Sequence, residues 1–330
     1  MQFLYFLEGL RNPVFDFFFE LITKLGEETV FLVVAILFFW CINKREGYFI
    51  LLSGLFGTLI NQAMKLIFRI PRPWVLDPNF DIVGGDAVKE AASGYSFPSG
   101  HTQNISTTLG AVAAFKKGRA RKIICITGIA LVAFSRMYLG VHTPLDVGVS
   151  LVIGAAIILA FRPIFTSEKN FKRAYPFIVI GAFACSVAYL IFVLCLSGDA
   201  TLDSHNYESG LKNACTLFGC TLGLVGVYFV DTYYVKFETE AKWYSQIIKI
   251  VVGLGGVLLI KSGLSSPLTA LFGNAYIARC VRYFLIVVFA GAVWPMTFKF
   301  FKKLEIPVFD RFGSRVVSIL KKDKKGDNAN

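Results

Sequence analysis

Charged residues are scarce in this sequence. Asp, Glu, Lys and Arg together make up only 17% of its 330 residues, whereas 55% of the residues are hydrophobic. An ordinary soluble domain has about a quarter charged residues. There is too little charge here to cover a water-facing surface, which argues against a soluble globular protein. A polar linker is also lacking, so we expect one helical bundle and not two soluble domains.

Metal-binding and disulfide patterns are missing as well. No CxxC pair occurs, and no cysteine lies at ligand spacing from one of the three histidines. The seven cysteines all lie in or beside apolar runs: Cys41, Cys125, Cys185, Cys195, Cys215, Cys220 and Cys280. This pattern excludes a zinc motif and a disulfide framework. We therefore expect neither a metal site nor a cofactor.

The distribution of positive charge argues against nucleic-acid binding. The formal net charge is +12, but the Lys and Arg residues fall in short segments between apolar runs. This arrangement is typical of the cytoplasmic loops of a membrane protein. We expect the lipid bilayer to be a partner of the chain, and nucleic acid not to be one.

Long apolar runs dominate what is present. A helix that crosses a bilayer needs roughly 20 mostly apolar residues. Nine stretches qualify: 28–43, 48–68, 101–116, 123–141, 144–162, 174–196, 211–230, 247–263 and 277–298. The expected fold is therefore all-α, a multi-pass membrane bundle of about nine spans.

Residues 1–27 differ from these stretches. They mix phenylalanines and leucines with charged residues, and Pro13 separates two short apolar runs. The basic start and unbroken apolar core of a cleaved signal peptide are absent. We predict that this segment forms interfacial amphipathic helices.

The charges of the connecting loops predict the orientation of the chain. Lys and Arg gather in the loops 44–47, 117–122, 162–173 and 231–245 and in the segment after residue 298. The alternate loop 197–210 contains Asp and Glu but no Lys or Arg. Because basic loops remain in the cytoplasm, we expect the C-terminus inside and the N-terminus outside. The long polar loop 69–97 then also lies outside.

Three polar clusters interrupt the apolar pattern, and the predicted orientation places all of them on the outer side. They are Lys65-x6-Arg72-Pro73, Pro98-Ser99-Gly100-His101 and Ser135-Arg136-x5-His142-x3-Asp146. Their agreement in depth and side indicates a single site at the outer ends of the helices. Ionisable groups at membrane depth are costly and usually functional.

The cations and the helix start suit a phosphate group. Lys65, Arg72 and Arg136 match the charge of a phosphate dianion, and an arginine binds two of its oxygens with its planar fork. Ser99 and Gly100 begin a predicted helix, where unpaired N–H groups and the helix dipole favour an anion. These five residues are the predicted phosphate-binding set.

The two histidines of the clusters suit phosphoryl chemistry. Asp146 follows His142 by four residues, so its carboxylate is predicted to reach one imidazole nitrogen and to leave the other free as a nucleophile. His101 is the candidate general acid, since imidazole titrates near neutral pH.

Together, the three clusters resemble the signature motifs of the type 2 phosphatidic acid phosphatase superfamily. The resemblance implies a phosphohistidine mechanism without a metal, with His142 as nucleophile, Asp146 as its partner and His101 as acid. The remaining positions that match the motifs would hold the phosphoryl oxygens: Lys65, Arg72, Ser99, Gly100 and Arg136. It also implies a phosphatase core over 28–196. Residues 197–330 would form additional spans and a basic cytoplasmic tail.

Several functions remain compatible with these motifs. A lipid phosphate monoester is the expected substrate. Trp74-Val75-Leu76-Asp77, the nine spans and the outer N-terminus also look similar to glucose-6-phosphatase, while sphingosine-phosphate phosphatases have extra spans too. Transfer of the phosphoryl group to an acceptor alcohol would use the same first step as hydrolysis. A transporter or binding protein is the third alternative, although transport requires no His142–Asp146 pair.

A few cations lie outside the motifs. Lys261, Arg279 and Arg282 fall near the predicted outer ends of their spans. Their simplest interpretation is that they extend toward lipid headgroups. Alternatively, they add positive charge for an anionic headgroup.

Overall fold

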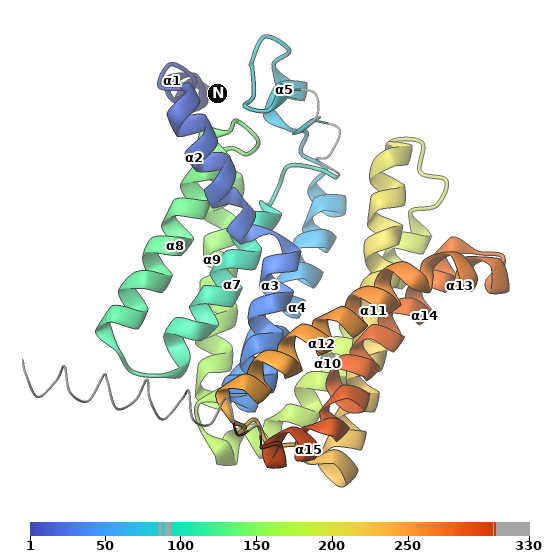
Figure 1. Cartoon of the computed structure of the whole chain (residues 1–330). Coiled ribbons are helices and arrows are strands. Elements are labelled where there is room, and N and C mark those ends of the chain that lie inside the picture. Colours follow the sequence, from blue (N-terminus) through green and yellow to red (C-terminus); the bar gives the residue numbers. More distant parts are fainter. Residues whose placement is uncertain (86–87, 90–93, 306, 308–330) are drawn as a thin grey trace, which may run out of the picture.

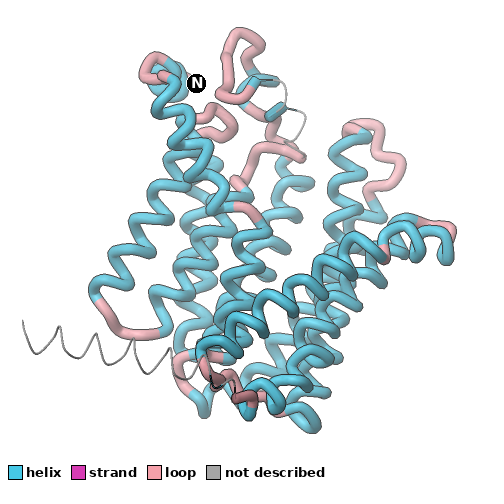
Figure 2. Tube along the Cα trace, viewed as in Figure 1, coloured by secondary structure: helices cyan, strands magenta, loops and turns pink. Residues whose placement is uncertain are grey.

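The computed structural model describes residues 1–85, 88–89, 94–305 and 307, and the regular structure in these residues is helical throughout (Figure 2). The all-α prediction is confirmed. The α-helices are α1 (Gln2–Glu8), α2 (Pro13–Thr23), α3 (Glu28–Leu37), α4 (Lys44–Phe68), α5 (Pro73–Leu76), α7 (Gly100–Phe115), α8 (Arg119–Tyr138), α9 (Pro144–Phe165), α10 (Glu168–Cys195), α11 (Ser204–Val230), α12 (Trp243–Gly263), α13 (Ser265–Phe272), α14 (Ala275–Val288) and α15 (Phe298–Lys303).

The number of membrane spans falls below the prediction of nine. Six helical segments in the described residues are long and apolar enough to cross a membrane, or seven if α2 and α3, which are bent by 53°, count as one span. The six are Lys44–Leu76, Pro144–Phe165, Glu168–Cys195, Ser204–Val235, Trp243–Gly263 and Ala275–Lys303. All nine predicted stretches are helical, but nine spans are not shown.

Two helices account for the difference between seven spans and nine. Helix α7 has only 16 residues, and several of them are polar. Helix α8 is long enough, but it carries Arg121, Lys122 and Arg136 within its 20 residues. Many polar side chains of α7 are buried inside the bundle, for example Gln103 and Thr107. Hydropathy therefore underestimates α7, because its polar groups face protein.

The helices α4, α7, α8 and α9 alternate in direction and pack side by side (Figure 1). The end of α4, the start of α7, the end of α8 and the start of α9 consequently meet at one end of the bundle. The N-terminal helices α1 and α2 pack against α8 at this same end. Helices α10 to α15 form the other side of the molecule. This arrangement brings the three sequence clusters together.

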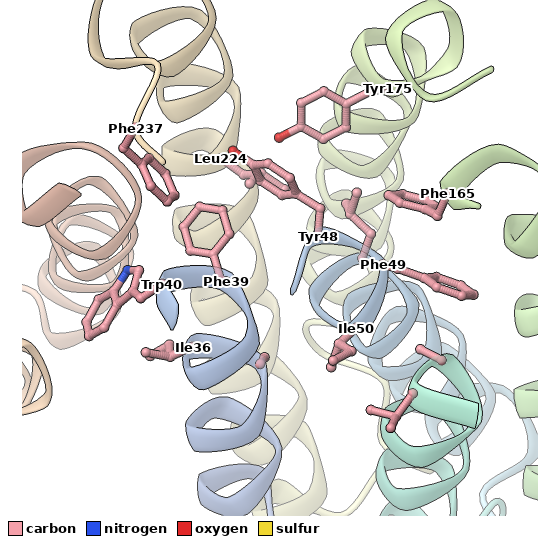
Figure 3. Close-up of a cluster of buried hydrophobic side chains, with 14 of the residues drawn as sticks. Ile36, Phe39, Trp40, Tyr48, Phe49, Ile50, Phe165, Tyr175, Leu224 and Phe237 are labelled. Carbon is pink, nitrogen blue, oxygen red and sulfur yellow. The ribbon is translucent and has the colours of Figure 1, made fainter. Parts of the chain in front are cut away.

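The main hydrophobic core lies at the opposite end of these helices, where α3 ends and α4 begins. Figure 3 shows its aromatic side chains, among them Phe49 and Phe165, whose rings stack with centroids 5.1 Å apart. Trp40 is fully buried and donates a hydrogen bond to the carbonyl of Ala290 at 2.8 Å. The core thus fixes the helices at one end and leaves the other end to the polar clusters.

Candidate active site

His142 and Asp146 form a buried pair at the start of α9. The imidazole Nδ1 lies 3.5 Å from Oδ2 of Asp146, and the two side chains are 2% and 1% exposed. A third residue, Ser96, contacts both side chains. Its hydroxyl donates to Oδ2 of Asp146 at 2.7 Å and is 3.3 Å from Nδ1 of His142. The predicted contact between the carboxylate and the histidine is therefore present, and Ser96 adds to it.

The start of α9 holds this carboxylate in place. Thr143 caps the helix: its hydroxyl accepts the backbone N–H of Asp146 at 3.3 Å, and Oδ2 of Asp146 accepts the backbone N–H of Thr143 at 2.7 Å. Pro144 occupies the first helical position, where its missing N–H costs nothing. Asp146 consequently cannot rotate away from His142 without breaking the cap.

The start of α7 is fastened to α9 and α4. The backbone N–H of Ser99 donates to the carbonyl of Asp146 at 3.2 Å, and Ser150 donates to the carbonyl of Ser99 at 2.9 Å. On the other side, the amide of Asn61 in α4 donates to the carbonyl of Pro98 at 3.2 Å. Ser99 caps α7, so the free N–H groups of its first turn lie at this junction.

The three predicted cations are buried around the same point. Lys65, Arg72 and Arg136 are 7–8% exposed. Lys65 donates to the carbonyl of Tyr95 at 2.5 Å, and Arg72 donates to the carbonyl of Gly94 at 3.2 Å. Backbone carbonyls of the loop before α7 thus help to hold Lys65 and Arg72 at this end of the bundle.

Arg136 is held partly by the N-terminal segment. Its Nη1 donates to the hydroxyl of Thr23 at 2.7 Å, while its buried Nε has no hydrogen-bond partner among the described residues. Its backbone carbonyl accepts the N–H of His142 at 3.3 Å. A buried N–H group without a hydrogen bond costs free energy unless a ligand accepts a hydrogen bond from it.

His101 lies in the first turn of α7 and is partly buried. The charges of Lys65, Arg72, Arg136 and His142 all act on it, which places it in the same cluster. Gly26 packs directly against it: a Cβ at Gly26 would lie 2.9 Å from both Cβ and the carbonyl oxygen of His101. The segment after α2 therefore forms a wall beside this histidine.

The environment of His142 favours the neutral imidazole. Burial lowers its pKa well below the usual value, and the hydrogen bond to Asp146 opposes this shift. With Nδ1 facing the carboxylate and the Ser96 hydroxyl, the proton belongs on Nδ1 and the lone pair on Nε2. A neutral histidine with a free Nε2 is suited to nucleophilic attack.

All eight predicted site residues therefore converge, and the structure adds several that sequence reasoning missed. Ser96 precedes the second motif by only two residues, and this closeness could have marked it as a site residue. Asn61 is a polar residue within an apolar run, which is a weaker indication of a role in the site. Thr23 and Gly26 carry no signal, because neither residue type nor spacing distinguishes them. Within the described part of the chain, no group of three or more His, Cys, Asp or Glu is placed to hold a metal ion.

The fold and the site together define a multi-pass integral membrane protein with a cationic, histidine-containing site at one end of its helices. The PAP2 superfamily model matches residues 46–170, which include all three motifs. A second model, described as the transmembrane extension of PAP2 superfamily phosphatases, matches residues 215–305. The chain belongs to the PAP2 superfamily, and the resemblance seen in the sequence is confirmed. The second match also accounts for spans that the motifs left unexplained.

Several curated proteins are similar to the chain. Lipid phosphate phosphatase delta of Arabidopsis thaliana is 22% identical over 77% of this chain and 63% of its own length. Undecaprenyl-diphosphatase of Sulfolobus acidocaldarius is 30% identical over 41% of this chain and 64% of its own length. Sphingosine-1-phosphate phosphatase 1 of Mus musculus is 26% identical over 53% of this chain and 41% of its own length. The chain spans less than two thirds of each relative's length, and no solved structure matches it.

Proposed function

We propose that this protein is a membrane phosphatase that hydrolyses a lipid phosphate monoester through a phosphohistidine on His142. The observation that supports this most directly is the buried His142–Asp146 pair, bridged by Ser96 and surrounded by three cations. The relatives support the substrate class, since they are named as phosphatases of lipid phosphate, sphingosine 1-phosphate and an isoprenyl diphosphate.

In the first step, Nε2 of His142 attacks phosphorus and the bond from phosphorus to the ester oxygen breaks. Protonated His101 gives its proton to the departing oxygen, so the alcohol leaves neutral. The proton on Nδ1 of His142 stays in place, and Asp146 stabilises the positive charge that develops on the ring. The cations and the N–H groups of the first turn of α7 bind the phosphoryl oxygens as their charge is redistributed.

In the second step, a water oxygen attacks the phosphohistidine. The bond between phosphorus and Nε2 breaks and its electron pair returns to His142. His101, now neutral, takes the proton from the water, which restores its starting state. Inorganic phosphate then leaves, and every group has returned to its original protonation.

The surroundings of the site favour a lipid over a sugar phosphate. Helix α2, which lies beside the site through Thr23, exposes large apolar side chains such as Val14 at 73% and Phe17 at 70%. Ile67 and Phe68 at the end of α4 are also more than half exposed. Such side chains pack favourably against acyl chains. A lipid substrate that approaches from the bilayer would therefore find an apolar surface beside the site. A glucose-6-phosphatase-type activity is the alternative and predicts hydrolysis of soluble sugar phosphates.

The proposed topology has nine crossings with the site on the extracytoplasmic side. Helices α7 and α8 run alongside α4 and α9, which supports their crossing the membrane despite their polarity. The basic loops lie at the end away from the site, and positive loops stay in the cytoplasm.

Trapping of the intermediate tests the mechanism. Purified protein would be mixed with a radiolabelled activated phosphate ester and quenched in alkali, because N-linked phosphohistidine survives base and is lost in acid. We expect acid-labile label on the wild type and none on His142→Ala. Label that persists in His142→Ala would overturn the assignment. Adding an acceptor alcohol to the steady-state assay separates hydrolysis from transfer: we expect a hydrolase to release mainly inorganic phosphate and a transferase to yield mainly a new phosphate ester.

A further inference from the structure

A second cationic site lies in the C-terminal extension, apart from the motif residues. A cavity of about 200 Å³ is lined by residues of α11, α13 and α14. Six of its lining side chains carry a hydrogen-bond donor: Lys212, Ser265, Thr269, Tyr276, Arg279 and Arg282. None of the residues that line it is acidic, and none belongs to the site described above. A concave surface with several donors, three of them cationic, suits an oxyanion.

The cations of this cavity are only partly satisfied. The buried Nε of Arg282 has no hydrogen-bond partner among the described residues. Arg279 makes a long hydrogen bond of 3.4 Å to the hydroxyl of Thr216. Lys212 pairs with Glu208 at 3.1 Å, but the two side chains are 47% and 55% exposed, so the pair contributes little. A bound anion would complete these groups.

Two of the helices that line the cavity also expose apolar side chains. Leu271 and Phe272 in α13 and Ile277 in α14 are 42–74% exposed. The cavity volume equals that of several water molecules at about 30 Å³ each, which is enough for a phosphate group but not for a lipid. The acyl chains of a lipid whose phosphate lies in the cavity would therefore cover these exposed side chains.

Helix α11 separates the two sites. One of its faces contacts α4, where Asn213 donates to Gln62 at 3.0 Å, and another contacts α14 through Thr216. The cavity thus lies behind the helix that supports the end of α4. It has its own donors and does not depend on the proposed catalytic residues.

We propose that this cavity binds the phosphate group of an anionic phospholipid. Water-soluble phosphate has the same chemistry, and the exposed apolar side chains of α13 and α14 favour the lipid as its source. The proposal concerns binding only, so it stands or fails separately from the phosphatase activity.

Calorimetric titration in detergent tests the proposal. The full-length protein would carry Arg72→Gln and Arg136→Gln, so that the other cationic site does not contribute. The probes are dihexanoyl phosphatidylglycerol, dihexanoyl phosphatidylcholine and inorganic phosphate. We expect the anionic lipid to bind, and Arg279→Gln with Arg282→Gln to weaken its binding about tenfold or more, because charge-assisted hydrogen bonds to the phosphate are lost.

A matched control removes the same charge elsewhere. Lys299→Gln with Lys303→Gln neutralises two exposed cations of α15, at the far end of α14, and should leave the affinity unchanged. If the double arginine variant does not fold, Lys212→Gln at an exposed position should still weaken binding several-fold. Equal loss in both double variants, or no loss in the arginine variant, would refute a specific site. If inorganic phosphate binds as tightly as the lipid, the cavity is a phosphate site, but its ligand is a soluble phosphate and not a lipid.

Discussion

The Ser96 hydroxyl donates a hydrogen bond to the Asp146 carboxylate at 2.7 Å and also lies 3.3 Å from Nδ1 of His142. Ser96 lies in the loop before α7, whereas Asp146 lies in the first turn of α9. Ser96 is fully buried, so no solvent competes for the contact. We infer that Ser96 is a positioning residue for the histidine.

Loss of this hydroxyl should slow turnover without weakening substrate binding. We expect Ser96→Ala to lower kcat about fivefold with little change in KM, since one buried hydrogen bond contributes about 1 kcal/mol. Ser96→Thr, which keeps the hydroxyl, should recover part of the loss. Ser186→Ala removes another buried serine, bonded to Thr221 at 2.6 Å far from the site, and serves as the control. Equal kcat losses in the two alanine variants would show that Ser96 is merely structural.

The two histidines should respond differently to the leaving group. We expect His142→Ala to be inactive on every ester, because no covalent intermediate can form. His101→Ala should lose about 10²–10⁴-fold on an alkyl phosphate but much less on a nitrophenyl phosphate, which departs without a proton. Steady-state rates on both esters give the comparison. Similar defects of His101→Ala on both, or activity of His142→Ala on the activated ester, would contradict the assigned roles.

The acid limb of the pH profile should lie below the usual histidine range. Burial lowers the pKa of His142, so the imidazole of the free enzyme stays neutral as the pH falls past 6.5. Activity requires the neutral form; it is therefore retained above the lowered pKa and lost only as the pH falls through it. The measurement is kcat/KM against pH with an activated ester. An acid limb above about 6.5 would be inconsistent with a buried nucleophile.

Turnover should survive chelation. In the proposed mechanism, two histidines and three cations supply the nucleophile, the acid and the charge stabilisation, so we expect unchanged rates after dialysis against EDTA. The assay is phosphate release before and after chelation, with magnesium restored in a parallel sample. Activity that disappears and returns with magnesium would show that a metal takes part.

The topology can be tested from outside intact cells. Cysteine introduced at Asn79, an exposed position near the site, should react with an impermeant thiol reagent. Cysteine at Gly118, in the basic loop between α7 and α8, should react only after the membrane is permeabilised. The parental protein, with its seven native cysteines, gives the background. The reverse labelling pattern would place the site in the cytoplasm.

The sequence was sufficient to predict the convergence of the motifs but not the number of spans. Loop charges alone predicted that residues 65–72, 98–101 and 135–146 share one end, and they do. Hydropathy does not establish α7 and α8 as spans, because a residue scale does not register that Gln103 faces protein and not lipid. In a helix whose polar groups are buried in protein, only the outward-facing residues are apolar. The mean hydropathy of all its residues is therefore too low to indicate a span.

The contacts of the N-terminal segment were beyond sequence reasoning for another reason. Thr23 contacts Arg136 across more than a hundred residues, and Gly26 fits against His101 because it lacks a side chain. Both residue types are common, and their role arises only from how α2 packs on α8. Sequence patterns report which side of a helix is apolar, but not which distant helix that side meets.

The same contacts have a consequence for biogenesis. The first helices leave the ribosome long before α9, yet they contribute Thr23 and Gly26 to a pocket that is complete only once Asp146 has followed. A nascent chain that stops before α9 contains His142 and the wall of the pocket but lacks Asp146. The proposed site is therefore completed late during membrane insertion, as a product of helix assembly and not of any single inserted segment.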